Sequence, residues 1–348
     1  MSDLSSATNP ERKAQLRRAV CGKCKASPWL PGDLPALEHV PCTKCGHPVI
    51  VPFRIRQFEL REVIASGGMG TVYRSFDITL ERQVAVKLLK REMAEDPQVL
   101  ESFDREARAG ASLNHTNIIH IYTFDEFEGR PYLVMELADH GSLDDRIEKN
   151  GLIPELNVLD YGIKIASALS TALKKNLLHR DIKPGNILFN EDGEPKLVDF
   201  GLARGTEEDA ERGSAVWGTP YYVAPEKVNR LGEDFHSDMY SLGGTLYHGL
   251  TGHVPFEAET IEAVVLAHVQ TPLTPPHEVN PEITLPTSEA IMTAMAKKPA
   301  ERFLTYEDFQ MALEAARSQL LVQQYRNAAP EEETSEERPH PSRAWWKR

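Results

Sequence analysis

A group of glycines and a lysine that follows it could together hold the phosphates of a nucleotide. Three glycines fall within residues 66–70, between two stretches that alternate like strands. Glycines there let the backbone approach phosphates closely, with N–H groups pointing at them. Lys87 ends the run V-A-V-K, and a lysine on a strand can hold phosphates once a carboxylate such as Glu106 orients it. Each signal is weak alone, because glycine clusters are common in hairpins and a helix glutamate is usually solvated.

The four cysteines could hold a metal ion. Cys21, Cys24, Cys42 and Cys45 have the spacing C-x2-C-x17-C-x2-C, which is typical of a zinc site built from two knuckles. A four-thiolate site has no open position, so the metal would be structural, and the small unit should unfold without it. Two disulfides or four free thiols are the alternatives, and a reducing cytosol disfavours disulfides.

The decisive motifs lie in the second half of the chain. H-R-D-I-K-P-G-N occupies residues 179–186, D-F-G residues 199–201 and A-P-E residues 224–226. Together with the glycines and Lys87, they stand in the order and at the spacing found in protein kinases. Residues 58 to about 318 resemble a eukaryotic-type (Hanks-type) protein kinase catalytic domain, and the segment after Ser237 is most similar to the bacterial branch.

The resemblance implies a role for each catalytic residue. Asp181 would orient the attacking hydroxyl and accept its proton. Lys183 would neutralise the γ-phosphate during its transfer. Lys87, paired with Glu106, would anchor the α- and β-phosphates, so that catalysis would consist mainly of positioning and electrostatic stabilisation.

The resemblance also implies where ATP and two Mg²⁺ ions bind. The main chain of Glu136 and Ala138 would meet the adenine edge next to a gatekeeper, Met135, and Val72 and Ala85 would enclose the ring. The expected ligands of the nucleotide are Ile64, Ala65, Ser66, Gly67, Gly68, Met69, Gly70, Val72, Ala85, Lys87, Glu136, Ala138, Asn186 and Asp199, of which Asn186 and Asp199 would hold Mg²⁺.

Two features favour serine or threonine as the phosphate acceptor. Lys183 stands two residues after Asp181, and residues 218–222 read G-T-P-Y-Y. Both resemble serine/threonine kinases rather than tyrosine kinases. Thr219 would then bridge Asp181 and Lys183 and form part of the platform for the peptide.

The resemblance further implies internal supports for the site. Glu226 would form a buried ion pair with Arg302, and Asp238 would anchor the catalytic loop. Gly110 lies one turn after Glu106, where the family usually has an apolar side chain. Two outcomes are open: either neighbouring side chains fill the space, or the helix is held loosely and needs a partner.

Regulation by phosphorylation is expected because Arg180 precedes Asp181, and a phosphate on the activation loop would pair with this arginine. Thr206 and Ser214 are the candidate sites. Ser214 is favoured, because acidic residues follow Thr206 and would repel a phosphate.

Ala65 replaces the first glycine of the nucleotide loop, which could weaken binding of the nucleotide.

These residues need particular elements to position them. Alternation predicts strands over residues 58–64, 71–74 and 83–88 and two more within 118–137, and helical patterns cover 98–113, 155–174 and 305–325. This order predicts an α+β fold with a β-rich small lobe and an α-rich large lobe. The expected sequence of units is a flexible leader (1–20), a zinc ribbon (21–50), the catalytic domain (58–318) and a disordered polar tail (327–348).

Composition excludes several classes of protein. The chain has 348 residues, a net charge of −13 and 41% hydrophobic residues, which excludes a wholly disordered chain. No apolar run reaches the length of a membrane span, and no secretory pattern precedes the domain, so we expect a cytoplasmic protein. Residues 1–56 carry nine Lys or Arg and four Asp or Glu, so the remainder of the chain is acidic.

We therefore expect a serine/threonine protein kinase that transfers the γ-phosphate of MgATP to protein substrates. Self-phosphorylation and dimerisation are compatible with this interpretation. One alternative is a zinc-ribbon pseudokinase scaffold, against which the complete set of catalytic residues argues. The other is a nucleic-acid-associated regulator, which the basic ribbon permits although no basic and aromatic surface demands it.

Overall fold

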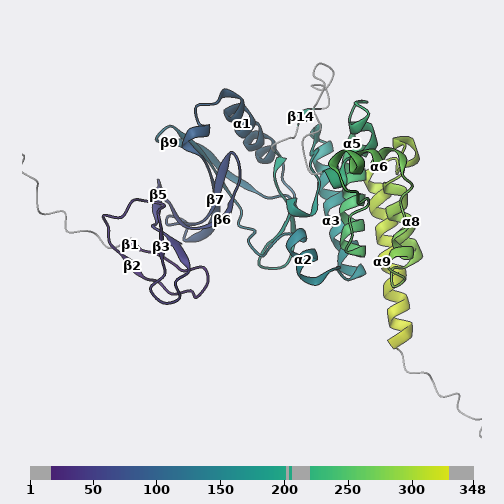
Figure 1. The fold of residues 1–348 in the computed structure, drawn as a ribbon, viewed down its shortest axis with the longest axis horizontal. Coiled ribbons are helices and arrows are strands. Elements are labelled where there is room, and N and C mark those ends of the chain that lie inside the picture. Colours follow the sequence, from purple (N-terminus) through teal and green to yellow (C-terminus); the bar gives the residue numbers. More distant parts are fainter. Residues whose placement is uncertain (1–16, 201–203, 206–219, 329–348) are drawn as a thin grey trace, which may run out of the picture.

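The computed structural model describes residues 17–200, 204–205 and 220–328, which form two lobes preceded by a small N-terminal unit (Figure 1). Strands build the small lobe, and helices build most of the large one. The predicted bilobal α+β architecture is therefore confirmed.

The small lobe is a six-stranded antiparallel sheet with the strand order β5-β6-β7-β8-β10-β9. Alternation along β6 turns Phe58 and Leu60 toward a buried cluster that also contains Val84 and Val86 of β8. The strands are β5 (Phe53–Ile55), β6 (Phe58–Ser66), β7 (Gly70–Asp77), β8 (Arg82–Leu89), β9 (Ile121–Phe127) and β10 (Arg130–Met135).

One long helix, α1 (Pro97–Ser112), packs against this sheet. The carboxylate of Asp96 accepts a hydrogen bond from the backbone N–H of Gln98, which caps the first turn. Phe103 on its inner face is almost fully buried among side chains of the sheet. The same face carries Glu106 toward the space between the lobes.

The large lobe is built mainly from helices around one apolar core. Its helices are α2 (Leu143–Asn150), α3 (Glu155–Leu173), α4 (Pro225–Val228), α5 (Phe235–Thr251), α6 (Ile261–Gln270), α7 (Pro276–Val279), α8 (Leu285–Ala294) and α9 (Tyr306–Ala328). A β-carbon at Gly162 would lie 2.7 Å from Leu246 and 3.0 Å from Leu313, so glycine lets α3 approach α5 and α9 closely.

Short strand pairs carry the loops that face the small lobe. β11 (Leu177–Leu178) pairs with β14 (Arg204–Gly205), and β12 (Ile187–Phe189) pairs with β13 (Pro195–Leu197). Within the described residues, no helix combines the length and apolar character needed to cross a bilayer.

The N-terminal unit contains two small hairpins and lies beside the small lobe (Figure 1). Its strands are β1 (Arg17–Arg18), β2 (Trp29–Leu30), β3 (His39–Pro41) and β4 (Pro48–Ile50). After this unit the chain enters β5, which pairs with β6 of the six-stranded sheet.

The structure differs from the predicted leader and tail at their inner ends. Residues 17–20 fall in the predicted leader, yet the backbone N–H of Ala19 donates to the carbonyl of Pro28, and Ala19 is fully buried. The unit therefore begins before Cys21, because its small core needs these residues. At the other end α9 continues to Ala328, two residues into the predicted tail, and residues 329–348 lie outside the described part.

Candidate active site and metal centre

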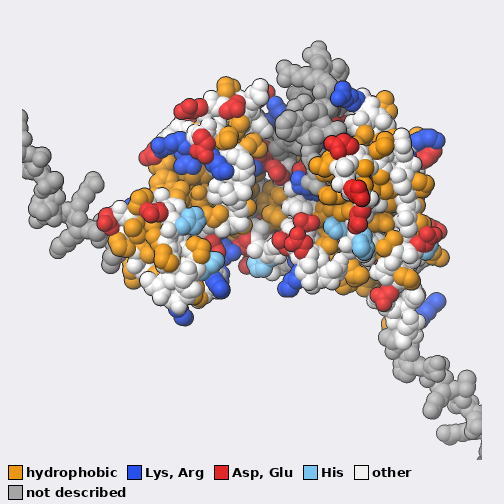
Figure 2. All heavy atoms as spheres, viewed as in Figure 1, with side chains coloured by type: hydrophobic (Ala, Val, Ile, Leu, Met, Phe, Trp, Pro, Cys, Tyr) orange, Lys and Arg blue, Asp and Glu red, His pale blue; other side chains and the backbone are white. Residues whose placement is uncertain are grey.

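A cavity of about 250 Å³ lies between the two lobes, and the surface is hollowed there (Figure 2). The small lobe contributes apolar side chains, among them Val72 and Ala85, and the large lobe contributes Leu188. Residues 135–138, which connect the lobes, form one wall. Lys87, Glu106 and Asp199 also line the cavity, so an apolar chamber opens next to charged groups.

Lys87 and Glu106 form a bidentate ion pair. Lys87 Nζ donates to Oε1 at 2.7 Å and to Oε2 at 2.8 Å, and Asp199 Oδ1 lies 3.8 Å from the same nitrogen. Burial alone would lower the pKa of Lys87, but the two carboxylates outweigh burial and raise it. The raised pKa favours the charged form of the lysine beside the cavity.

Two donors converge on the carboxylate of Asp181. Lys183 Nζ donates to Oδ2 at 2.7 Å. The side-chain amide of Asn186 donates to the same oxygen at 3.0 Å and to the Asp181 carbonyl at 2.7 Å. Asn186 ends the short 3₁₀ turn Pro184–Asn186, which begins directly after Lys183. The orientation of Asp181 is thus fixed by its own loop.

A buried carboxylate in α5 holds this loop from the large lobe. Asp238 accepts hydrogen bonds from the backbone N–H groups of His179 and Arg180, each at 2.7 Å. These bonds support Arg180 in a left-handed backbone conformation, with φ of 68°, which is unusual for a residue other than glycine. The ring of His179 also contacts Phe200 edge-on, with centroids 4.7 Å apart, and so links the H-R-D and D-F-G motifs physically.

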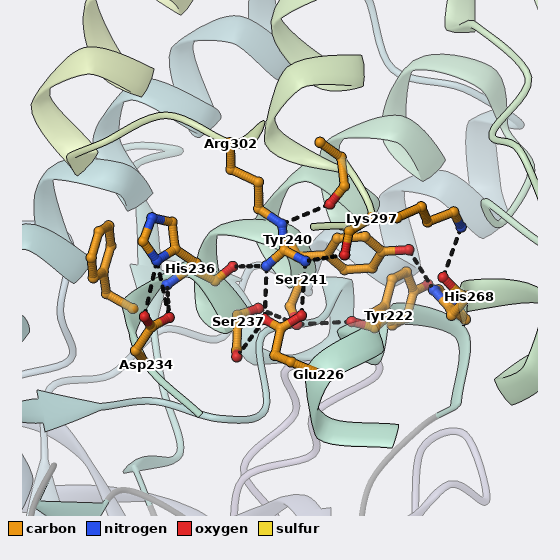
Figure 3. Close-up of polar contacts among 12 residues, drawn as sticks. Tyr222, Glu226, Asp234, His236, Ser237, Tyr240, Ser241, His268, Lys297 and Arg302 are labelled. Atoms are coloured by element: carbon orange, nitrogen blue, oxygen red, sulfur yellow. Dashed lines mark hydrogen bonds and ion pairs between the residues drawn. The ribbon is translucent and has the colours of Figure 1, made fainter. Parts of the chain in front are cut away.

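Glu226 and Arg302 form a second ion pair deep in the large lobe (Figure 3). The guanidinium donates to both carboxylate oxygens, at 2.7 and 2.8 Å, and to the carbonyl of His236 at 2.7 Å. The hydroxyl of Ser237 donates to Glu226 Oε1 at 2.7 Å. Burial alone would raise the pKa of Glu226, but Arg302 and Ser237 lower it below its ordinary value.

The space beside Gly110 is filled. A β-carbon built on Gly110 would overlap Cδ1 of Ile121 and lie 3.2 Å from Cγ1 of the same side chain. Of the two outcomes that the sequence left open, the structure favours filling by a neighbour.

The glycine-rich turn lies beside the cavity rather than in its wall. Of the predicted nucleotide ligands, Ile64, Ala65, Val72, Ala85, Lys87, Glu136, Ala138 and Asp199 line the cavity, whereas Asn186 and residues 66–70 do not. Met69 packs instead against the buried cluster that contains Phe103 of α1. A β-carbon at Gly70 would lie 2.9 Å from the carbonyl oxygen of Leu88, so glycine is needed there. Ala65 lies within β6 opposite Val72, in extended backbone.

Several lining residues were absent from the sequence prediction. Leu133, Leu188 and Val198 line the cavity together with Phe200. Leu188 follows Asn186 by two residues, and alternation in β12 could have indicated it. Leu133 and Val198 carry no comparable signal, because apolar residues in strands are most often core.

The four cysteines come together. Their Sγ atoms all lie within 4.8 Å of one another, with Cys21 and Cys45 separated by 3.6 Å and Cys24 and Cys42 by 3.7 Å. All four are free thiols. A tetrahedral zinc ion with bonds of about 2.3 Å separates its sulfur ligands by roughly 3.8 Å, so this donor set fits zinc in both chemistry and spacing.

Several residues of the predicted activation segment fall outside the described part of the chain. They are Gly201 of the D-F-G motif, Thr206, Ser214 and Thr219. Arg180, the expected partner of an activation-loop phosphate, lies within the described part. Its Nε is 3.8 Å from Glu233, which also lies 3.6 Å from Lys227.

The sequence is similar to that of known proteins. The model of the protein kinase domain family matches residues 58–313. The chain is 37% identical over 248 residues to a probable serine/threonine-protein kinase of Clostridium acetobutylicum, a match that covers 71% of this chain and 38% of that protein. It is 34% identical over 261 residues to the serine/threonine-protein kinase PrkC of Bacillus subtilis, covering 75% and 40%. It is also 34% identical over 255 residues to the serine/threonine-protein kinase PknB of Mycobacterium leprae, covering 72% and 41%.

The aligned part thus spans about two fifths of the length of these relatives. The family match covers most of this chain, and it begins at Phe58, where β6 enters the sheet. The chain belongs to the protein kinase domain family.

Proposed function

We propose that this chain is a serine/threonine protein kinase, which transfers the γ-phosphate of MgATP to hydroxyl groups of proteins. The observation that carries the proposal is the closed Lys87–Glu106 ion pair beside the cavity, with Asp199 within 4 Å of the lysine. A protein kinase needs this pair and this aspartate in place at the same time. The names of the relatives, all serine/threonine-protein kinases, support the choice of acceptor.

In this proposal the cavity holds adenine, and the charged groups hold the phosphates. The main chain of Glu136 and Ala138 contacts the adenine edge, and Lys87 contacts the α- and β-phosphates. Asn186 and Asp199 offer an amide and a carboxylate oxygen, which are the donors that Mg²⁺ prefers. When bound there, Mg²⁺ supplies positive charge that offsets the charge of the phosphates.

Asp181 prepares the acceptor hydroxyl. Its carboxylate is held by Lys183 and Asn186, so it can orient the hydroxyl and accept its proton. The hydroxyl oxygen of the substrate forms a bond to the γ-phosphorus. At the same time the bond between this phosphorus and the oxygen that bridges the β- and γ-phosphates breaks, and ADP leaves. Lys183 stabilises the negative charge on the transferred group.

Activation-loop phosphorylation is the regulation that we propose for this site. Arg180 is the cation that a phosphate on Ser214 would pair with, which would order the loop. Phosphopeptide mapping of active protein tests this, and active protein that carries no phosphate at Ser214 contradicts it.

We also propose that the four cysteines bind one structural Zn²⁺ ion. Their thiol groups already converge, and the hairpins β1–β2 and β3–β4 that carry them have little core of their own. Metal binding would then supply the stability that such a small unit lacks.

Labelled ATP tests the proposed activity. Wild-type protein should transfer the γ-phosphate of labelled ATP to proteins of a cell extract, and Asp181→Asn should reduce this at least about 100-fold. Asp192→Asn is the matched control, since this exposed aspartate lies in the turn between β12 and β13. Equal labelling by wild type and Asp181→Asn would defeat the proposal.

A further inference from the structure

One cysteine knuckle lies directly on the small-lobe sheet. Gly22 stands between Cys21 and Cys24, and a β-carbon built on it would overlap the carboxylate of Glu62, with Cδ at 2.6 Å. Glu62 belongs to β6, the strand that leads into the glycine-rich turn. A side chain at position 22 would displace this carboxylate, so with glycine there the carboxylate packs against the backbone of the cysteine knuckle.

Glu62 is the first of three charged residues that lead from this knuckle to the nucleotide cavity. It is paired across the sheet with Arg74 of β7, and Arg74 Nη1 lies 3.6 Å from Glu62 Oε2. The other terminal nitrogen of Arg74 forms an ion pair with Asp139. Asp139 directly follows Ala138, which lines the cavity.

These contacts are partly shielded from solvent. The side chains of Glu62 and Arg74 are each 29% exposed, and that of Asp139 is 10% exposed. Screening is weaker for partly buried ions than for fully exposed ones. A displacement of Glu62 would therefore change the electrostatic potential at the guanidinium of Arg74. Through Arg74 it would also change the position of Asp139.

The N-terminal unit also shares a hydrophobic core with the sheet. Ile50 of β4 and Ile55 of β5 belong to the same buried cluster as Leu60 of β6 and Val86 of β8. Pairing of β5 with β6 extends the sheet by one strand. The unit is thus joined to the small lobe by the continuous backbone, by a shared core and by the approach of Glu62 to Gly22, so loss of the unit would affect β6.

We propose that the cysteine unit helps to position the nucleotide site, so that the affinity for ADP depends on the metal. This inference rests on the proposed zinc centre and kinase activity. With metal bound, the knuckle holds Glu62, and Arg74 acts as a positioning residue that fixes Asp139 and the adjoining segment at the adenine wall. Without metal the unit unfolds, and this restraint is lost.

Linkage makes the effect reciprocal. If metal strengthens ADP binding by a given factor, ADP must strengthen metal binding by the same factor. Typical coupling between sites is about 5-fold to 150-fold. The coupling can therefore be measured on the metal side, without stripping the protein and without assaying phosphate transfer.

The experiment compares the full-length protein with and without zinc. The Kd of a fluorescent ADP, mant-ADP, is measured in Mg²⁺ buffer before and after treatment with EDTA and dialysis. We expect the Kd to rise at least about fivefold after zinc removal. We also expect ADP to slow the release of zinc from untreated protein to a chromogenic chelator.

Two variants show whether Glu62 carries the effect. Glu62→Gln keeps the size of the side chain and all four cysteines, so it should bind zinc while losing most of the zinc dependence of its ADP affinity. Glu59→Gln is the matched control, since Glu59 lies on the same strand and pairs with Arg61 at 2.8 Å. This control should retain the full zinc dependence.

The outcomes separate the two proposals. Zinc bound at one ion per chain, with an unchanged mant-ADP Kd and no effect of ADP on zinc release, overturns the coupling alone. Retention of the coupling by Glu62→Gln overturns the route through Glu62. Purified protein that holds no zinc and gains none on reconstitution overturns the metal centre and the coupling together, whereas kinase activity is tested separately by Asp181→Asn.

Discussion

Lys87 on β8 and Glu106 on α1 meet through two hydrogen bonds of 2.7 and 2.8 Å, although they belong to different elements of the small lobe. Glu106 is 6% exposed, so its carboxylate is almost completely shielded from solvent. The helix thus holds Glu106 in the position that the proposed phosphoryl transfer requires. Ile121, which fills the space beside Gly110, helps to explain why the short residue there does not loosen α1.

Removal of the lysine should abolish phosphate transfer and leave the fold intact. Lys87→Met should lower kcat/KM at least about 100-fold, because the phosphates lose their fixed positive charge in the transition state. Steady-state kinetics with labelled ATP measure this, with circular dichroism as the test of folding. Lys175→Met, on an exposed lysine, should be indistinguishable from wild type; similar kinetics for the two variants would contradict the role of Lys87.

The Glu226–Arg302 pair should stabilise the large lobe strongly at neutral pH. Arg302→Met leaves Glu226 buried without its cation, and we expect a loss of about 3–5 kcal/mol in the free energy of unfolding. Urea denaturation at pH 7 measures this. Arg317→Met is the control, because Arg317 pairs with Asp160 at 3.3 Å but is 36% exposed, and it should cost about 1 kcal/mol or less.

The same pair should be sensitive to acid. The folded-state pKa of Glu226 lies below its ordinary value of 4.5, so folding favours the ionised carboxylate. The resulting stability is fully present above pH 4.5 and is lost as the pH falls through the lower folded-state pKa. The difference between wild type and Arg302→Met should therefore shrink below pH 4.5. A difference that stays constant between pH 7 and pH 3 would contradict this.

A larger side chain at position 110 should be harmful. Gly110→Leu forces Ile121 out of its place, and we expect a loss of about 1–3 kcal/mol in stability without a gain in activity. Thermal unfolding and initial rates measure the two effects. The double variant Gly110→Leu/Ile121→Ala makes room for the leucine and should recover part of the stability. Higher basal activity of Gly110→Leu with normal stability would show that α1 was loosely held.

The zinc centre should depend on each cysteine. Purified protein should contain one zinc ion per chain, and Cys24→Ser should reduce this severalfold and lower the melting temperature, because one of four ligands is lost. Elemental analysis with calorimetry measures both. His39→Ala, on an exposed residue of β3, is the control and should keep its zinc. Full zinc content in Cys24→Ser would contradict the proposed ligand set.

The sequence was sufficient for the features that short motifs encode. The H-R-D and D-F-G motifs identified the loops that hold Asp181 and Asp199, because this chemistry needs fixed residue types at fixed separations. The spacing of the cysteines predicted their convergence, since each knuckle is a local turn. Alternation located the strands β6 to β10 of the small lobe but not the short β5, and the change to helical patterns located the large lobe.

Features that depend on packing between distant segments could not be predicted. Ile121 fills the space at Gly110 only because β9 lies beside α1. Glu62, Arg74 and Asp139 form a chain only because of strand register and the position of the segment between the lobes. In the sequence, each of these three residues looks like an ordinary solvent-exposed charge. The pattern of one segment does not show which residue of another segment its charged side chain contacts.

Analysis of the phosphorylated amino acids tests the central claim most directly. Wild-type full-length protein is incubated with γ-labelled ATP, Mg²⁺ and a general protein substrate such as casein, and the labelled residues are identified after acid hydrolysis, with Asp181→Asn as the blank. The account predicts label on phosphoserine or phosphothreonine in the wild-type sample and almost none in the Asp181→Asn sample. Label on tyrosine alone, or equal label in both samples, would contradict it.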